Sequence, residues 1–264
     1  MRQPVLIATS ISEILGTSAT ELRCSDGVVD VRSDRDVIVW SRAGHASNPT
    51  RVQGPLSVRA VWHGAESFVV GRRTLCVDDD TYLVINDGHA YSTLAHRRDA
   101  PESLTVFFSN ETRRECETRV SERDFFSEHL RPHDDVATPD LRDLLDAVRC
   151  GVVDNAWYAQ RVRRLYASLV LADEELHRRA VVFAPASLLT RTELLRRVMT
   201  ATDYVNSNYM SAVTLADIAS AAHLSKYHLA RLFRALHGVS PAAYVRLKRI
   251  RAAERLIERS DADL

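Results

Sequence analysis

The sequence predicts an α+β chain in which a β-rich first part is followed by helices. Short β-branched and aromatic runs alternate with turn residues through the first hundred residues. From about residue 124, apolar residues recur at helical spacing instead. The chain has 264 residues, of which 45% are hydrophobic, so it can build one large core or two ordinary ones.

Strands are expected where apolar runs are bracketed by turn signals. Such runs occupy 37–40, 57–62, 67–70, 82–85 and 103–108. Dipeptides such as Gly54-Pro55 and Asp87-Gly88 separate them. Regularly punctuated short strands are typical of a β-sandwich or a barrel.

Two helices are predicted after the strands, over 141–149 and 156–176, because apolar residues repeat there every three or four positions. The proline-containing segment 181–191 resembles a linker. The predicted organisation is therefore an N-terminal domain over 1–180 and an all-α domain over 190–264.

The last seventy residues predict a helix-turn-helix. A first helix is expected over 192–206, with Thr192 as its cap, and a short helix over 215–222 is capped by Thr214. After a brief turn, Ser225 caps a third helix that Gly238 ends. Two helices joined by so short a turn are the geometry in which the second helix enters the major groove.

The outward face of this third helix is the candidate DNA-reading surface. Tyr227 and Arg231 have the length and chemistry to reach base edges, whereas Ser225, Lys226 and Arg234 suit phosphates. A helix pair with a basic exposed face also occurs without any DNA function, and for an arbitrary protein that simpler interpretation would be favoured.

The residues that follow this helix favour the DNA-reading interpretation over the simpler one. The run Gly-x-Ser-Pro-x-x-Tyr at 238–244, and the Arg-x-x-x-Ala after it, resemble the AraC/XylS family of transcription regulators. So does the preceding pattern of Leu, Ala, Ser, Arg and Phe between Leu215 and Phe233. The resemblance covers about seventy residues.

The family resemblance implies a cupin-like β-barrel at the N-terminus and dimerisation through the two helices after it. It also implies two helix-turn-helix units joined by a long helix, here 241–259, and bases facing Tyr227, Ala230 and Arg231. Ala230 could touch only a thymine methyl. Because the sequence stops at Leu264, the expectation is a DNA-binding domain truncated after the connecting helix. An alternative is a relative that no longer reads DNA and acts as a decoy by dimerisation.

The distribution of charge agrees with a nucleic-acid partner. The chain as a whole is neutral, but residues 191–264 hold 12 Lys+Arg against 7 Asp+Glu. The predicted partner is double-stranded DNA bound by a homodimer. No apolar run is long enough to cross a bilayer, so no membrane partner and a cytoplasmic location are expected.

A cupin-type enzyme is the third alternative. His63, Glu66 and His89 are the only tempting ligands, but the His-x-His pair of metal cupins is missing. Nor do the cysteines Cys24, Cys76, Cys116 and Cys150 form a C-x-x-C pair. We therefore expect no metal, cofactor or enzyme activity. Trp40, Trp62, Phe68 and Tyr91 could line a small-effector site, although a role in the core is the simpler interpretation.

Overall fold

The computed structural model describes residues 5–8, 20–25, 28–42, 48–95, 101–117, 126–183 and 187–262. These residues form two compact units, Met1–Glu174 and Glu175–Leu264. The predicted change of texture near residue 124 lies outside the described residues. No helix of the described part is both long and apolar enough to span a membrane.

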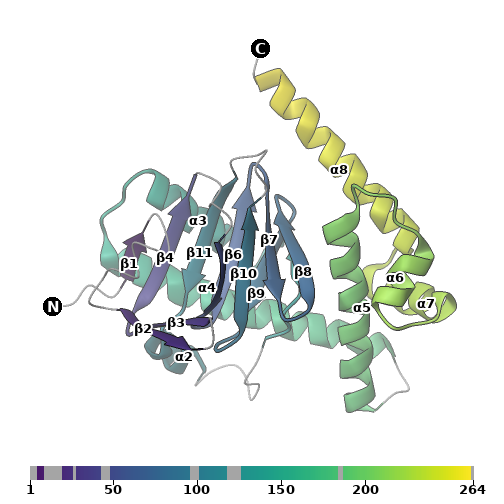
Figure 1. The fold of residues 1–264 in the computed structure, drawn as a ribbon, viewed down its shortest axis with the longest axis horizontal. Coiled ribbons are helices and arrows are strands. Elements are labelled where there is room, and N and C mark those ends of the chain that lie inside the picture. The colour runs from purple at the N-terminus through teal and green to yellow at the C-terminus, as the bar shows by residue number, and fades with distance from the viewer. Residues whose placement is uncertain are drawn as a thin grey trace. The chain divides into compact units, whose positions relative to one another are not determined.

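The first unit contains two six-stranded sheets (Figure 1). The first sheet has the order β1 (Val5–Ala8), β4 (Asp36–Ser41), β11 (Glu102–Phe107), β6 (Ser57–Trp62), β9 (Thr81–Ile85) and β12 (Leu130–Pro132). The second sheet has the order β2 (Thr20–Ser25), β3 (Val28–Ser33), β5 (Asn48–Gln53), β10 (Ala90–Ala95), β7 (Ala65–Val70) and β8 (Arg73–Asp78).

The α+β class is confirmed, and of the sandwich and the barrel that the strand pattern left open, the two sheets do not close into a barrel. Among the described strands, each pairs only within its own sheet, so β1 and β12 remain edges of one sheet and β2 and β8 edges of the other. Closure is not needed to bury the first sheet, because its two faces are covered by different layers. One face packs on the second sheet and the other packs on helices.

Successive side chains along each strand of the first sheet point to opposite faces, and so they form one core on each face. In β9, Leu83 and Ile85 join a cluster with Phe68 and Tyr91 of the second sheet. Tyr82 and Val84 point the other way and pack with the helices. Those helices are α3 (Thr138–Arg149) and α4 (Asn155–Arg179), where the sequence predicted them, and a shorter helix is α2 (Asn110–Glu117).

Buried charges tie the helices to the sheet. Arg131 of β12 forms a hydrogen-bonded ion pair with Asp173 of α4, and both residues are buried. Asp140 of α3 is buried and accepts from the Ser168 hydroxyl of α4 at 2.9 Å. Such pairs fix the register between layers, because removing one partner would leave a buried charge unpaired.

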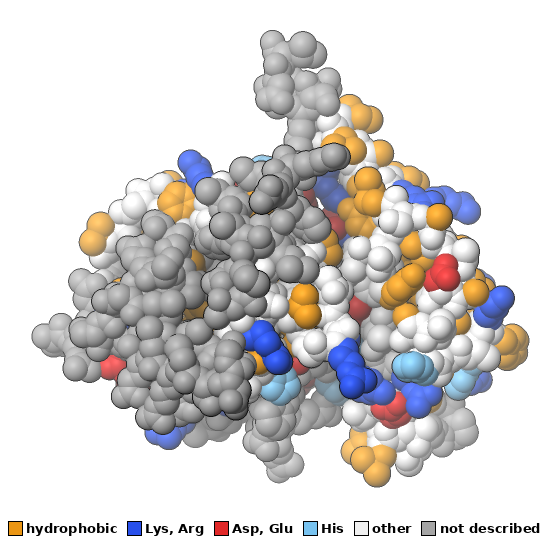
Figure 2. Space-filling model, in the orientation of Figure 1, with side chains coloured by type: hydrophobic (Ala, Val, Ile, Leu, Met, Phe, Trp, Pro, Cys, Tyr) orange, Lys and Arg blue, Asp and Glu red, His pale blue; other side chains and the backbone are white. Residues whose placement is uncertain are grey.

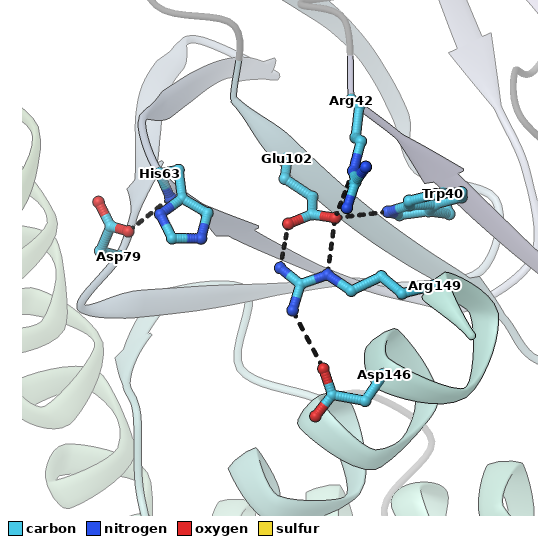
Figure 3. Close-up of polar contacts among 7 residues, drawn as sticks. All are labelled: Trp40, Arg42, His63, Asp79, Glu102, Asp146 and Arg149. Atoms are coloured by element: carbon cyan, nitrogen blue, oxygen red, sulfur yellow. Dashed lines mark hydrogen bonds and ion pairs between the residues drawn. The ribbon is translucent and has the colours of Figure 1, made fainter. Parts of the chain in front are cut away.

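A second charged cluster joins β4, β11 and the end of α3 (Figure 3). Glu102 accepts from Trp40 Nε1 at 2.8 Å and from Arg149 Nε at 2.9 Å, and Arg42 lies nearby at 3.4 Å. The hydrogen bonds from Arg149 lower the pKa of Glu102 to about 2. Asp146 contacts the outer side of Arg149 at 3.0 Å.

Glu102→Gln is expected to destabilise the first unit by about 1–2 kcal/mol at neutral pH, since charge-assisted hydrogen bonds become neutral ones. The folded pKa lies below the unfolded value, so the stabilisation is present above about pH 4.5 and is lost as the pH falls towards 2. Urea unfolding of parent and variant across this window measures both effects. Asp146→Asn is the matched control, because its exposed ion pair contributes little.

The second unit is helical. A short 3-10 helix, η1 (Ala180–Phe183), precedes α5 (Leu188–Asn208), α6 (Leu215–Ala221), α7 (Lys226–His237) and α8 (Pro241–Ala262). All five elements contribute buried side chains to one core. The contribution of α6 includes Ile218, and that of α8 is Val245.

The start of the first helix in this unit differs from the prediction. α5 begins at Leu188, and its cap is Ser187, whose hydroxyl accepts from Thr190 N at 3.3 Å. Thr192 lies inside the helix and its hydroxyl donates to Leu188 O. Part of the predicted linker over 181–191 is therefore helical. Serine and threonine at neighbouring positions both suit a cap, and the sequence pattern did not distinguish them.

Candidate nucleic-acid interface

The helix-turn-helix consists of α6, a tight turn and α7. Thr214 and Asp217 form a reciprocal capping box at the start of α6. Ser225 caps α7 by accepting from His228 N at 3.2 Å, as predicted. Gly238 ends α7 in the left-handed conformation, with φ of 75°, which glycine adopts without strain. These caps fix where α6 and α7 begin and where α7 ends.

The turn between α6 and α7 is held by hydrogen bonds from both sides. His223 has a left-handed φ of 52°, and its carbonyl accepts from Arg197 of α5 at 3.1 Å. Leu224 N donates to Ala219 O at 2.9 Å. Arg197 is itself oriented by Glu193 one turn earlier, at 2.7 Å. Helix α5 thereby holds the turn in place through Arg197.

One face of α7 is buried in the core of the unit. Leu229, Leu232, Phe233 and Leu236 are buried and recur at helical spacing. Phe233 lies against the rings of His237, with centroids 4.4 Å apart, and Tyr244, at 5.5 Å. This packing leaves the opposite face of α7 towards solvent.

The structure places the predicted DNA-contacting residues on that exposed face. Ala230 is half-buried. The other five side chains are exposed: Ser225, Lys226, Tyr227, Arg231 and Arg234. Tyr227 is 81% exposed although it is a large aromatic residue. Spacings of three, four and seven residues put Tyr227, Arg231 and Arg234 on one stripe of the helix. Figure 2 shows Lys and Arg side chains on the surface of this helical unit.

The helix α8 anchors the end of α5 beside the helix-turn-helix. Arg249 donates from Nε to Tyr209 O at 2.8 Å and from Nη2 to Ser211 O at 2.7 Å. Lys248 is buried, with its Nζ 5.1 Å from the Tyr209 ring centroid. These basic residues stabilise the unit itself, so the charge count of the C-terminal region overstates the charge free for a polyanion.

The first unit separates the aromatic residues that were considered together as an effector site. Phe68 and Tyr91 lie between the two sheets, with ring centroids 6.4 Å apart. Trp40 and Trp62 pack instead with the helix-covered core. Alternation of side chains along neighbouring strands explains the split, so the four residues do not line one site.

The three candidate metal ligands, His63, Glu66 and His89, each have a different structural environment. His63 sits in a turn with φ of 60°, and its backbone N donates to Asp79 at 2.6 Å (Figure 3). His89 pairs with Glu128 at 2.7 Å, whereas Glu66 is buried in β7. Within the described ranges, no group of three or more His, Cys, Asp or Glu side chains is arranged to hold a metal ion.

The capped helix pair, its short turn and its exposed basic face define a helix-turn-helix protein of the DNA-binding type. Residues 205–246 match the model of the bacterial regulatory helix-turn-helix proteins of the AraC family. The matched residues run from the end of α5 through α6 and α7 into α8. The chain therefore contains, over these residues, a helix-turn-helix that matches the AraC type.

Solved structures provide more distant likenesses. Fatty-acid-bound ToxT from Vibrio cholerae strain SCE256 is 9% identical, covering 80% of this chain and 94% of its own, with a TM-score of 0.37. ToxT from Vibrio cholerae O395 is 8% identical, covering 80% and 96%, with a TM-score of 0.35. The AraC-like activator CuxR is 16% identical, covering 75% and 66%, with a TM-score of 0.33. No curated protein matches the sequence.

Proposed function

We propose that this protein is a transcription regulator that reads a specific site in double-stranded DNA with α7. The observation that carries the proposal is the stripe of Tyr227, Arg231 and Arg234 on the solvent face of a capped second helix. Arg231 takes the role of base reader, because a guanidinium can bond both O6 and N7 of guanine. Tyr227 and Ala230 make apolar contacts beside it.

Phosphate contacts are assigned to Ser225, Lys226 and Arg234. Ser225 and Lys226 lie at the start of α7, where free N–H groups and the positive end of the helix dipole attract a phosphate. Arg234 lies two turns further on and is exposed. Contacts of this kind position the helix on any duplex, whereas base contacts select the site.

The N-terminal unit supplies effector binding and dimerisation in this proposal. A single helix-turn-helix makes few contacts, and two copies on neighbouring half-sites would gain affinity through effective concentration. Exposed Leu171 on α4 is available to such a contact between copies. Sedimentation of the chain with and without its DNA site would distinguish a dimer from a monomer.

The test starts from DNA selected by the protein itself. A random duplex pool is enriched on the purified chain, and the recovered duplex is compared with a scrambled version by fluorescence anisotropy at two salt concentrations. Arg231→Ala should weaken binding to the selected duplex by about 1–3 kcal/mol, roughly 5- to 150-fold, and leave the scrambled duplex nearly unaffected. Arg114→Ala, which removes an exposed arginine of α2, is the matched control.

Lys226→Ala and Arg234→Ala separate the two kinds of contact in the same assay. Each should weaken binding to both duplexes alike and reduce the salt slope by about one. If enrichment yields no preferred sequence, or if Arg231→Ala weakens both duplexes equally, α7 is not the reading helix.

A further inference from the structure

A buried arginine lies between the two sheets of the first unit. Arg59 is on the inner face of β6 and is 2% exposed. Its guanidinium carbon lies 4.0 Å from the centroid of the Tyr91 ring and 5.1 Å from that of Phe68, both in the second sheet. Phe107 of β11 is on its other side at 5.5 Å. Three rings therefore surround this cation.

The polar contacts of Arg59 are too few for its charge. Its two hydrogen bonds, to Thr105 Oγ1 and Ser57 Oγ, are both 3.4 Å long and end on neutral hydroxyls. Its Nε is buried without a hydrogen-bond partner among the described residues, and the same is true of the Tyr91 hydroxyl beside it. No described carboxylate lies within ion-pair distance of its guanidinium.

Glu66 of β7 is a buried carboxyl within the field of Arg59, and it compensates Arg59 incompletely. Burial raises the pKa of Glu66 to about 7, although the field of Arg59 acts in the opposite direction. At neutral pH this carboxyl is therefore only partly ionised. The core between the sheets therefore holds an excess of positive charge, together with two buried polar atoms, Arg59 Nε and the Tyr91 hydroxyl oxygen, that have no hydrogen-bond partner among the described residues.

A buried cation without an anionic partner is costly. Contacts with aromatic faces recover part of the lost hydration, but an apolar residue of similar volume would avoid the cost altogether. Natural proteins accept such costs at functional sites. The chemistry of the missing partner follows from the site: one negative charge, two acceptor oxygens in a plane, and an apolar body to lie among aromatic and aliphatic side chains.

We propose that the inner face of the β-sandwich binds a small organic monocarboxylate, with its carboxylate on Arg59 and the Tyr91 hydroxyl. A monoanion balances the single guanidinium, whereas an inorganic dianion would bring a second uncompensated charge into the same apolar surroundings. The inference rests on the proposed function only in giving this ligand the role of effector. Binding itself does not require that the chain reads DNA.

The test is calorimetric titration of the full chain, without DNA, with benzoate and hexanoate as probes. Benzamide serves as the neutral isostere of benzoate, and inorganic phosphate as the anion without an apolar body. At least one carboxylate should bind, and Arg59→Met should weaken it roughly 10- to 100-fold, as expected when a charge-assisted hydrogen-bond pair is lost. Tyr91→Phe should weaken it less, and Arg72→Met, at an exposed turn, should leave it unchanged.

The melting temperature without ligand distinguishes a receptor from a structural arginine. Arg59→Met should melt at the same temperature as the parent or higher, because an uncompensated buried cation is removed. A lower melting temperature would show that Arg59 holds the sheets together and would overturn the proposal. So would equal binding of benzoate and benzamide, phosphate binding alone, or no binding of either carboxylate. Selective DNA binding with no carboxylate binding contradicts this inference alone, whereas the reverse contradicts only the proposed function.

Discussion

Phe233→Ala is expected to unfold the helix-turn-helix and with it to abolish selective DNA binding. Phe233 is fully buried at the centre of the helical unit and contacts the rings of His237 and Tyr244. Removing a buried phenyl ring costs about 3–5 kcal/mol, a large part of the total stability of a small domain. The change is read from helical circular dichroism during thermal melting and from anisotropy on the selected duplex.

Tyr227→Ala is the matched control for this prediction. Tyr227 is an aromatic residue of the same helix, but it is 81% exposed. Its truncation should leave the melting transition of the unit almost unchanged and should affect only DNA binding. A Phe233→Ala variant that melts like the parent would mean that the core of the unit does not depend on α7. A Tyr227→Ala variant that melts much earlier would mean that its side chain is not free for DNA.

The parts of the fold that could be predicted are those in which one local signal was sufficient. The strands around Val37, Val58 and Leu83 combine β-branched residues with clear turn signals, and the structure has strands at all three. The caps Ser225 and Gly238 carry their own geometry. The relation between sheets has no local signal, because it depends on which edges pair across long stretches of chain. The strand pattern therefore left a sandwich and a barrel both open, and only the structure shows that the sheets do not close.

Strands with a weak local signal show the same limit. β8 contains Arg73, Thr74 and Asp78, and β12 is only three residues long, so neither stands out as an apolar run. They are strands because β7 and β9 lie beside them with free hydrogen-bonding edges. Pairing partners supplied by the rest of the sheet outweigh weak local preference.

For the candidate sites, the sequence identified exposed residues better than buried ones. The face of α7 follows from helical periodicity, and the structure exposes the residues that the periodicity selected. The burial of Arg59 was missed, although a signal existed: a lone arginine at an inward position of the apolar strand Ser57–Trp62. That signal could not say whether a carboxylate from another strand would neutralise the arginine. His237 carries no such signal at the end of its helix, and the structure packs its ring against Phe233 and Tyr244.

The helical unit is expected to lose stability below about pH 6.5 because of His237. Thr202 Oγ1 donates to Val198 O at 3.0 Å, so the 2.8 Å contact between Thr202 Oγ1 and His237 Nε2 uses the N–H of a neutral imidazole. Burial, together with the nearby charge of Arg179, lowers the pKa of His237 to about 4. Protonation would place a charge between Phe233 and Tyr244, whose ring centroids lie 4.4 Å and 5.3 Å from the imidazole.

The sign of the pH dependence follows from the lowered pKa. The folded state favours the neutral imidazole, so the contribution is fully present above the ordinary pKa of 6.5 and is lost as the pH falls from 6.5 towards 4. The loss should reach on the order of 3 kcal/mol, from about 1.4 kcal/mol for each unit of pKa difference. His237→Gln keeps a donor for Thr202 but does not titrate, so the melting temperature of the variant should lack the pH slope that the parent shows in this range. Glu102 titrates below this window, and Glu66 acts with the opposite sign because its pKa is raised. A parent and a His237→Gln variant with parallel melting curves between pH 7 and pH 4 would show that His237 does not control the acid stability of the unit.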